Sequence, residues 1–252
     1  MAKAFRVWNG TTIHPAHGSL ADIRDAVLAL KPAGTWGLEW LPKAGEGGTW
    51  QSEWDHHPLA IDGPDKLRQL YREGKRMRPK LAVTPYIVVR GGAAWQEAEW
   101  EQIAACAAVT GRVVLNLEPG GMYWLGQTDA DALTQEYLLP LEARLAGVAP
   151  RAKLHLTAIP RRWCFDELGG AATMVSWLYA CYSASFECYG DIAPDLRVDV
   201  AIPRAKAMLA EVGVTLPARY YYPLVQRSEI GRWASTPWAR YGLECWCLDS
   251  DI

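Results

Sequence analysis

The chain has 252 residues, with 28 acidic and 26 basic side chains and a formal net charge of −2 when histidine is neutral. Half of the residues are hydrophobic and 21% are charged, as in a soluble globular protein with a sizeable core. This balance excludes the broad positive field that nucleic acid or an anionic membrane would require, so neither is expected as a partner.

Eight runs rich in β-branched and aromatic residues predict strands, and helical patterns separate them. The strands are expected at 5–8, 36–41, 81–89, 112–118, 153–159, 174–182, 219–225 and 243–248. The helices are expected at 21–30, 64–73, 95–109, 129–146, 203–212 and 228–241, with Pro140 kinking the fourth. A short glycine-rich stretch, 164–172, is expected to complete the fifth crossover.

The alternation of strands and helices predicts successive βα units on a parallel sheet. The length is close to the roughly 250 residues typical of a (β/α)8 domain. We therefore expect residues 1–252 to form a single TIM-barrel domain. Its last helix should be absent, because the sequence ends soon after the eighth predicted strand. Two long connections, 9–20 and 42–63, should form walls above the barrel.

Neither a transmembrane run nor the apolar segment of a signal peptide is evident in the sequence. The chain is therefore expected to be cytoplasmic as synthesised, which leaves later release open. The sequence does not predict an oligomeric state.

The fourth predicted strand ends in an acidic residue. Asn116 and Glu118 are two positions apart and share one face, whereas Leu115 and Leu117 should face the helices. Glu118 is therefore expected in the mouth of the barrel, where active sites of this architecture lie. The alternative is a solvated carboxylate, or one paired with an arginine such as Arg162.

Two further carboxylates are candidate partners of Glu118. Asp249 is expected to share one face of the eighth strand with Cys245, and Glu39 is expected to end the second strand. Carboxylates that converge on a cleft suit glycoside hydrolysis, with Glu118 as general acid and Asp249 or Glu39 as base or nucleophile. Strands four and eight lie on opposite sides of a barrel, and a separation of roughly 6.5–9.5 Å would favour inversion. A terminal charge without a role and a structural ion pair are the respective alternatives.

Aromatic residues at predicted strand ends support a sugar substrate, because flat rings with polar edges suit pyranose faces. The chain has 13 tryptophans against three phenylalanines. The proposed contacts are Trp8, Trp40, Tyr86, Trp124, Tyr182, Tyr222 and Trp246. Each could instead be a core residue. Arg161 and Arg162 could hold a substrate carboxylate or phosphate, or could pair with Glu118 or Asp166.

The sequence Asn116-Leu117-Glu118 resembles the Asp-x-Glu that ends the fourth strand in glycoside hydrolase family 25 lysozymes and related barrels. In that family an Asp also ends the first strand and another ends the eighth, where this chain has Asn9 and the segment 249–251. The resemblance implies a muramidase-like activity on peptidoglycan, with Asn9 and Asn116 as substrate contacts. Asn in place of Asp also fits a non-catalytic glycan-binding or assembly barrel.

Loop histidines raise a second alternative, a metal-dependent hydrolase. Imidazoles and the carboxylate of Asp55 in the two long connections could bind zinc or another divalent ion. These histidines are His14, His17, His56 and His57. His155, inside the fifth predicted strand, is expected to be a hydrogen-bonded core residue. No metal or other cofactor is expected for the glycosidase.

Overall fold

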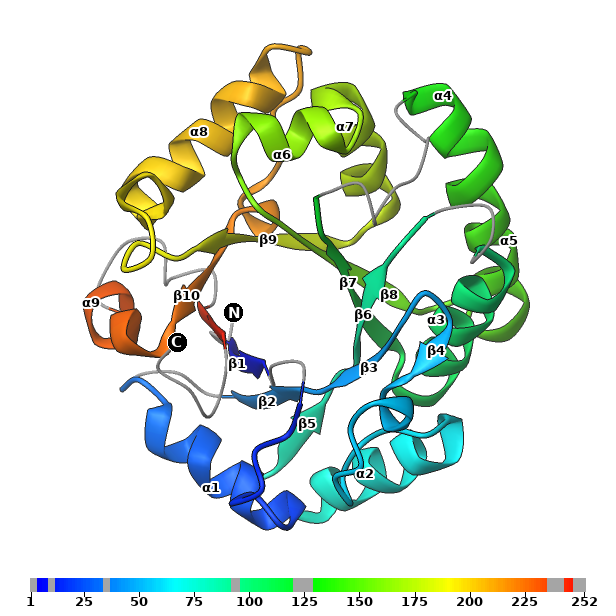
Figure 1. Cartoon of the computed structure of the whole chain (residues 1–252), viewed down its shortest axis with the longest axis vertical. Coiled ribbons are helices and arrows are strands. Elements are labelled where there is room, and N and C mark those ends of the chain that lie inside the picture. Colours follow the sequence, from blue (N-terminus) through cyan, green and yellow to red (C-terminus); the bar gives the residue numbers. More distant parts are fainter. Residues whose placement is uncertain are drawn as a thin grey trace.

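A computed structural model of the chain describes residues 4–8, 12–33, 37–91, 96–119, 129–234 and 243–246. They form a mixed α/β structure in which helices surround one curled sheet (Figure 1). The strands are β1 (Ala4–Trp8), β2 (Gly37–Leu41), β3 (Lys43–Glu46), β4 (Thr49–Trp50), β5 (Leu81–Val83), β6 (Tyr86–Val89), β7 (Arg112–Leu117), β8 (Lys153–Ala158), β9 (Ser183–Cys188), β10 (Tyr222–Gln226) and β11 (Leu243–Trp246).

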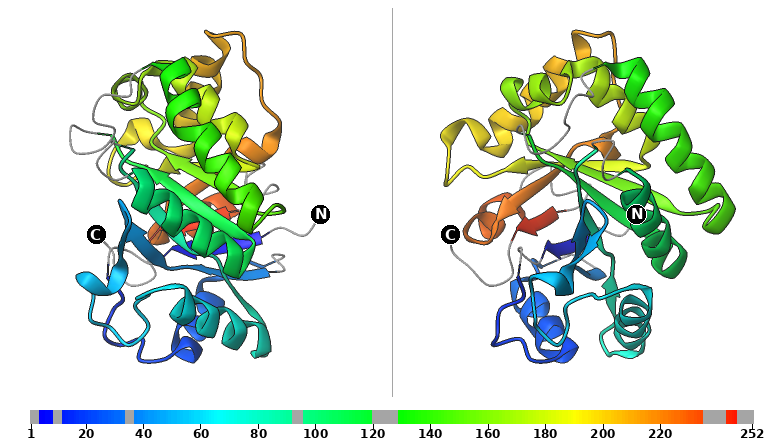
Figure 2. Two further views of the ribbon diagram at one scale, coloured as in Figure 1. Left: turned by 90° about the vertical axis from the view of Figure 1, so that its right-hand side faces the viewer. Right: turned by 45° about the vertical axis from the view of Figure 1, so that its right-hand side comes forward.

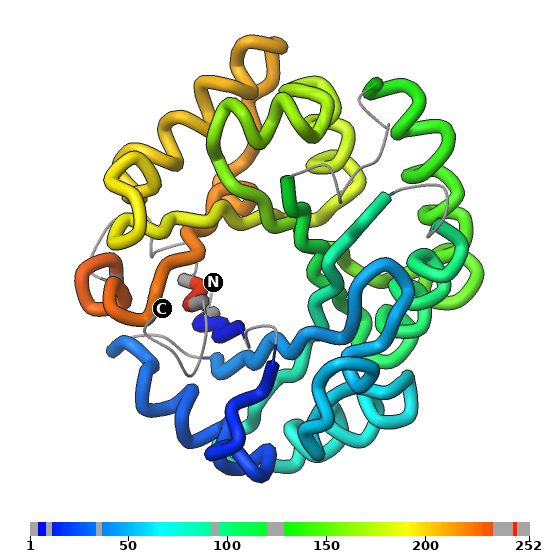
Figure 3. Tube along the Cα trace, in the orientation of Figure 1, coloured from blue at the N-terminus to red at the C-terminus, as the bar shows by residue number. Residues whose placement is uncertain are grey.

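The strands are ordered β4-β3-β6-β7-β8-β9-β10-β11-β1-β2-β5. Every neighbouring pair is parallel except β3 with β4. Strands β1 and β11 come from opposite ends of the described chain and lie side by side, with Phe5 opposite Leu243 (Figure 3). The predicted parallel sheet is therefore confirmed.

Two pairs of strands are separated by short proline-containing breaks. Pro42 lies between β2 and β3, and Thr84 and Pro85 lie between β5 and β6. Proline has no amide hydrogen to donate to the ladder. Pairing nevertheless continues on both sides, because β2 pairs with β5 and β3 pairs with β6. At the break, the Thr84 amide donates to the Trp40 carbonyl at 3.0 Å, and the Tyr86 amide donates to the Pro42 carbonyl at 2.9 Å.

The helices lie outside the sheet (Figure 2). They are α1 (Leu20–Leu30), α2 (Pro64–Arg76), α3 (Gln96–Thr110), α4 (Ala130–Leu133), α5 (Leu139–Val148), α6 (Arg162–Glu167), α7 (Gly170–Ala180), α8 (Val198–Ala210) and α9 (Ile230–Ala234). Local sequence explains several starts. A capping box joins Ser19 and Asp22 at α1, and Pro64 occupies the first turn of α2.

The sixth predicted strand, 174–182, is wrong. Most of that run belongs to α7, and the strand is β9. The buried side chains of α7 are Thr173, Met174, Trp177 and Leu178, a helical spacing that β-branched and aromatic residues obscured in the sequence. This error moves the carboxyl end of the strand from Tyr182 to Cys188.

Other boundaries also differ from the prediction. The expected loop 42–63 contains β3, β4 and a 3₁₀ turn at Gln51–Glu53. A π-helical turn, Thr134–Leu138, precedes Pro140, whose nitrogen cannot donate the hydrogen bond of a regular α-helix. Helix α8 begins before Pro203 rather than at it. A 3₁₀ turn at Ala218–Tyr220 replaces the start of the seventh predicted strand.

Two apolar cores lie on the two faces of the sheet. The larger one, between sheet and helices, includes Phe5, Trp40, Leu115, Phe186 and Cys245. The smaller one lies on the inner face and consists of Trp8, Leu41, Tyr86, Val88, Val114 and Leu224. Alternation along each strand thus sends one side chain outward and the next inward.

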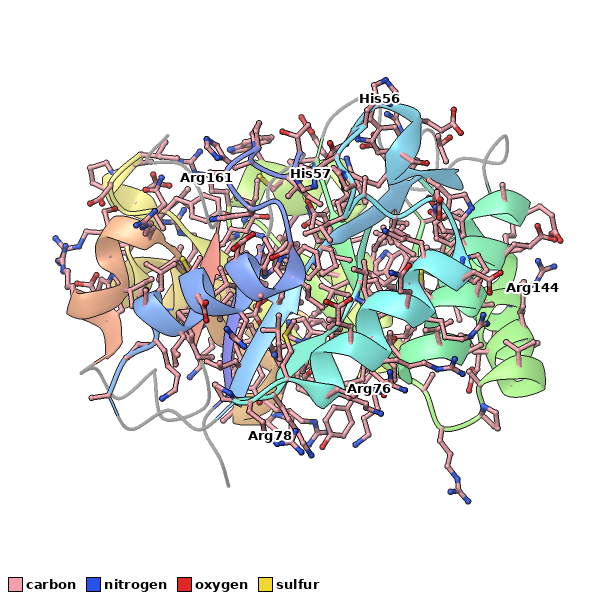
Figure 4. All side chains as sticks on the ribbon, turned by 90° about the horizontal axis from the view of Figure 1, so that it is seen from below. His56, His57, Arg76, Arg78, Arg144 and Arg161 are labelled. Atoms are coloured by element: carbon pink, nitrogen blue, oxygen red, sulfur yellow. The ribbon has the colours of Figure 1, made fainter. Side chains whose placement is uncertain are left out.

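The carboxyl ends of the parallel strands lie at one end of the molecule, and their amino ends lie at the other. His56 and His57, in the connection after β4, lie at one end, and Arg76 and Arg78, which precede β5, lie at the other (Figure 4). Groups that follow a strand, such as Glu118, therefore belong to the carboxyl end. Groups that precede one belong to the amino end.

Candidate functional site

Glu118 follows the last residue of β7 at the carboxyl end of the sheet. The side chain of Asn116, 1% exposed, lies on the inner face and donates from Nδ2 to Glu118 Oε1 at 2.7 Å. Glu118 itself is half-buried, and no ion pair to it occurs among the described residues. The predicted shared face of Asn116 and Glu118 is therefore present as a direct contact.

A second carboxyl group, Glu187 on β9, is 5% exposed and belongs to the same row of the sheet. Leu117 pairs with Ala158, and Ala158 pairs with Phe186, so the next position along brings Glu118 and Glu187 to the same level. They are two strand spacings apart, about 10 Å between backbones, and both side chains face inward. Glu187 accepts a hydrogen bond from Tyr189, just beyond the same strand.

Burial and mutual repulsion control the protonation of this pair. The pKa of Glu118 is raised, mainly by burial and also by the negative charge of Glu46. The hydrogen bond from Asn116 and the positive charge of Lys43 lower the same pKa, but they do not outweigh burial. Burial and the nearby Glu118 together raise the pKa of Glu187 well above its ordinary value. Two carboxyl groups with raised pKa values on the same inner face can retain a proton at neutral pH.

A salt-bridge cluster on β3 lies next to Glu118. Glu46 accepts hydrogen bonds from Lys43, at 2.8 Å, and from Arg90. Burial alone would raise the pKa of Glu46, but the two cations outweigh it and lower that pKa. The Lys43 ammonium also lies 4.8 Å from the ring centroid of Trp54. Glu46 therefore remains an anion that faces Glu118 across the inner side of the sheet.

Glu39 occupies a different place from the one predicted. It lies in a buried network near the amino ends of the strands, paired with Arg6 at 2.9 Å and Arg112 at 3.2 Å, and it accepts from Thr84. Burial would raise its pKa, but the two arginines lower it. The chain continues past Leu41 as β3, so Glu39 does not end a strand at the site of Glu118.

The same network includes Glu244 on β11. Its carboxylate contacts Arg6 at 2.6 Å, His155 at 3.1 Å, and the Trp8 indole at 3.1 Å. His155 also contacts the hydroxyl groups of Ser183 and Ser185, and burial lowers its pKa despite the carboxylate. His155 is therefore a hydrogen-bonded interior residue, as expected from the sequence.

The five predicted aromatic contacts that the structure describes are distributed over three regions. Trp8 and Tyr86 are buried in the inner core with ring centroids 4.5 Å apart, whereas Trp40 is buried between sheet and helices. Tyr182 and Tyr222 lie at the amino ends of β9 and β10. The structure thus does not gather these rings around Glu118.

Several predicted residues lie outside the described part of the chain: Asn9, Trp124, Asp249, and the side chain of Trp246. Cys245, which is expected to share one face of the eighth strand with Asp249, packs in the outer core, and Glu244 faces inward.

The two arginines after β8 make ion pairs on the outside of the molecule. Arg161 binds both carboxylate oxygens of Asp195, at 3.0 and 2.8 Å, and these hydrogen bonds together with Arg204 lower the pKa of Asp195 to about 2. Arg162 is exposed and pairs with Glu211. Among the described residues, neither forms an ion pair with Glu118 or Asp166.

The loop histidines are not arranged as a metal site. Asp55 accepts from the Ile13 amide at 2.9 Å, from Gln51 at 3.1 Å and from the His57 amide at 3.0 Å, which ties the two long connections together. Within the described ranges, no three His, Cys, Asp or Glu side chains gather as metal ligands. Nor do those ranges contain a helix long and apolar enough to cross a membrane.

The sequence prediction missed Glu187, Tyr189, Glu46 and Lys43. Glu187 was missed because the sixth strand was placed too early in the chain. The alternation in Ser183-Ala184-Ser185-Phe186-Glu187, followed by a glycine at 190, was the available signal. Glu46 and Lys43 lie within the predicted connection 42–63, which begins at Pro42.

Comparisons with models of known protein families and with curated protein sequences gave no match. A comparison with solved structures found the crystal structure described as the C-terminal domain of a putative chitinase from Desulfitobacterium hafniense DCB-2. The match covers 90% of this chain and 66% of that one, with a TM-score of 0.56 and 16% sequence identity. This chain thus spans just under two thirds of that structure. At this identity the likeness shows a shared fold.

Proposed function

We propose that this protein is a glycoside hydrolase-like (β/α)8 barrel that cleaves a glycosidic bond, with Glu118 as general acid. The observation that carries the proposal is the environment of Glu118. It is a half-buried carboxyl group at the carboxyl end of a central strand, oriented by Asn116 and with a raised pKa. A general acid must hold its proton near neutral pH, and burial beside other carboxylates favours this.

The barrel assignment is supported by the pairing of the strands. If β2 with β3, and β5 with β6, each count as one interrupted strand, the parallel pairs connect eight positions in chain order, and the first pairs with the last. The hairpin strand β4 lies outside this count. The carboxyl ends of such a barrel are where active sites are found.

The partner of Glu118 has two candidates. Asp249 remains our prediction from the sequence. Glu187 is added by the structure, and its raised pKa suits a group that shares a proton with Glu118 better than it suits a nucleophile. Glu39 is not proposed, because Arg6 and Arg112 hold it near the amino ends of the strands.

Asn116 supports a substrate contact as well as an orienting role. Its Oδ1 atom is buried and has no hydrogen-bond partner within the described part of the chain. A buried acceptor without a donor is costly, and a sugar hydroxyl would satisfy it. The description of the structural neighbour as a domain of a putative chitinase and the family 25 resemblance both favour β-linked aminosugar polymers. We therefore propose peptidoglycan or chitin as the substrate.

The test compares the wild type, Glu118→Gln and the surface control Glu73→Gln on peptidoglycan, chitin and a panel of other α- and β-linked glycans. We expect hydrolysis of at least one polymer, a loss of about 10²- to 10⁴-fold in Glu118→Gln and no loss in Glu73→Gln. Unchanged hydrolysis in Glu118→Gln would refute the assignment. Binding without hydrolysis by the wild type would replace it with a glycan-binding barrel.

A further inference from the structure

A cavity of about 580 Å³ lies on the outside of the fold, between the end of α5, the end of α7 and the turn before β10. Several of its lining residues, such as Ala152, Cys181 and Arg219, lie in the last few residues before β8, β9 or β10. It therefore belongs to the amino end of the sheet, opposite Glu118. Its volume falls within the roughly 300–1,000 Å³ of small-molecule sites.

The floor of this cavity is apolar and its edge is aromatic. Leu141, Leu154 and Cys181 are buried beneath it, whereas Tyr179 and Tyr182 are 66% and 49% exposed. Two tyrosine rings with so much exposed surface beside an apolar floor can cover a ligand with an apolar body.

The charges around the cavity are mainly positive. Arg151, Lys153 and Arg219 line it together with one carboxylate, Glu142. Lys153 Nζ lies 4.1 Å from the ring centroid of Tyr182. Arg219 Nε donates to the Tyr182 carbonyl at 2.8 Å, which fixes the arginine while other donors of its guanidinium remain. The head group that this edge can recognise is therefore an anion.

We propose that this cavity binds a small amphiphilic anion, with an apolar or aromatic body between Tyr179 and Tyr182 and an acidic head at Lys153 and Arg219. We infer an amphiphilic anion from the apolar floor and the positive edge together, because either feature alone occurs on many protein surfaces. The site is separate from the proposed catalytic end and does not depend on glycan hydrolysis.

The proposal is tested with the fluorescent probe 8-anilinonaphthalene-1-sulfonate, which has an aromatic body and a single anionic group. We expect saturable binding at one site per chain, weakened by added salt. Dodecanoate should displace the probe, whereas dodecyltrimethylammonium, with the same chain and a positive head, should not. Binding that is unsaturable, or equal displacement by both, would overturn the proposal.

Variants then locate the site. Lys153→Gln should weaken probe binding about fivefold, Lys153→Glu should weaken it further, and Lys153→Arg should retain it. Lys75 also lies over a tyrosine ring, 4.0 Å from the centroid of Tyr71, but outside the cavity, so Lys75→Gln is the matched control and should bind as the wild type does. Ala180→Trp should block the cavity. Wild-type binding by Lys153→Glu in a variant folded by circular dichroism would refute the site.

Discussion

Replacing Arg6 with methionine should strongly destabilise the fold. The guanidinium of Arg6 contacts Glu39 at 2.9 Å and Glu244 at 2.6 Å, and all three side chains are less than a tenth exposed. With Arg112, the network contains two cations and two carboxylates; without Arg6, one buried negative charge is uncompensated. Breaking a buried pair by removing one partner costs about 3–5 kcal/mol.

This loss should depend on pH. In the wild type, Arg6 helps lower the folded-state pKa of Glu39 and Glu244, so their contribution is present above their unfolded pKa of roughly 4.3 and is lost as pH falls through the folded values. Without Arg6, burial raises the pKa of Glu244, and the folded variant then binds a proton that the unfolded chain has released. The destabilisation should therefore be largest near pH 7 and smaller near pH 5.

Urea unfolding followed by circular dichroism measures both effects. A loss of about 3–5 kcal/mol corresponds to a decrease in melting temperature of about 6–20 °C for a domain of this size. The double variant Arg6→Met/Glu244→Gln should recover a large part of the loss, because Arg112 still pairs with Glu39, whereas Glu244 has lost its arginine. A loss below about 1 kcal/mol, equal losses at the two pH values, or no recovery in the double variant would refute the reasoning.

Three further predictions concern packing and protonation. Gly147→Ala should stabilise α5 by about 0.5–1 kcal/mol, because an added Cβ meets nothing within 4 Å. Gly74→Ala in α2 should destabilise the protein by about 1–3 kcal/mol, because its Cβ would lie 2.3 Å from a carbonyl oxygen of β5. Similar urea midpoints for the two variants would contradict these opposite expectations. Glu46→Gln should lower the pKa of Glu118 by removing a negative charge, so the alkaline limb of the pH profile of kcat/KM should move to lower pH; a shift to higher pH would count against it. Trp40→Ala should cost about 3–5 kcal/mol of stability and leave glycan affinity unchanged in the folded variant, because Trp40 packs in the larger core. Weakened glycan binding would instead show that Trp40 contributes to the substrate site.

Some features of the site followed from local sequence. The two-residue spacing of Asn116 and Glu118 implies a shared face in any strand, and the structure joins them by a hydrogen bond. On β11, Cys245 packs in the outer core and Glu244 faces inward. Alternation relates neighbouring residues to one another, but it does not say which of the two faces points to the interior.

Long-range neighbours were beyond the reach of sequence reasoning. Glu39 and Glu118 look equivalent in the sequence, as acidic residues near the ends of apolar runs. Their environments differ because Arg6 and Arg112 form ion pairs with Glu39. Glu118 instead accepts a hydrogen bond from Asn116 and shares the inner face with the carboxyl group of Glu187. A pKa depends on such partners, which are brought together only when distant strands pair.

The sequence by itself determined the general alternation of strands and helices, the parallel sheet and the place of Glu118 at the end of β7, because these depend on patterns within a few residues. Tertiary structure decided which carboxylates face each other, which tryptophans are buried outside the sheet and where β9 begins. Those outcomes depend on packing between segments far apart in the chain, where tertiary contacts outweigh local propensity.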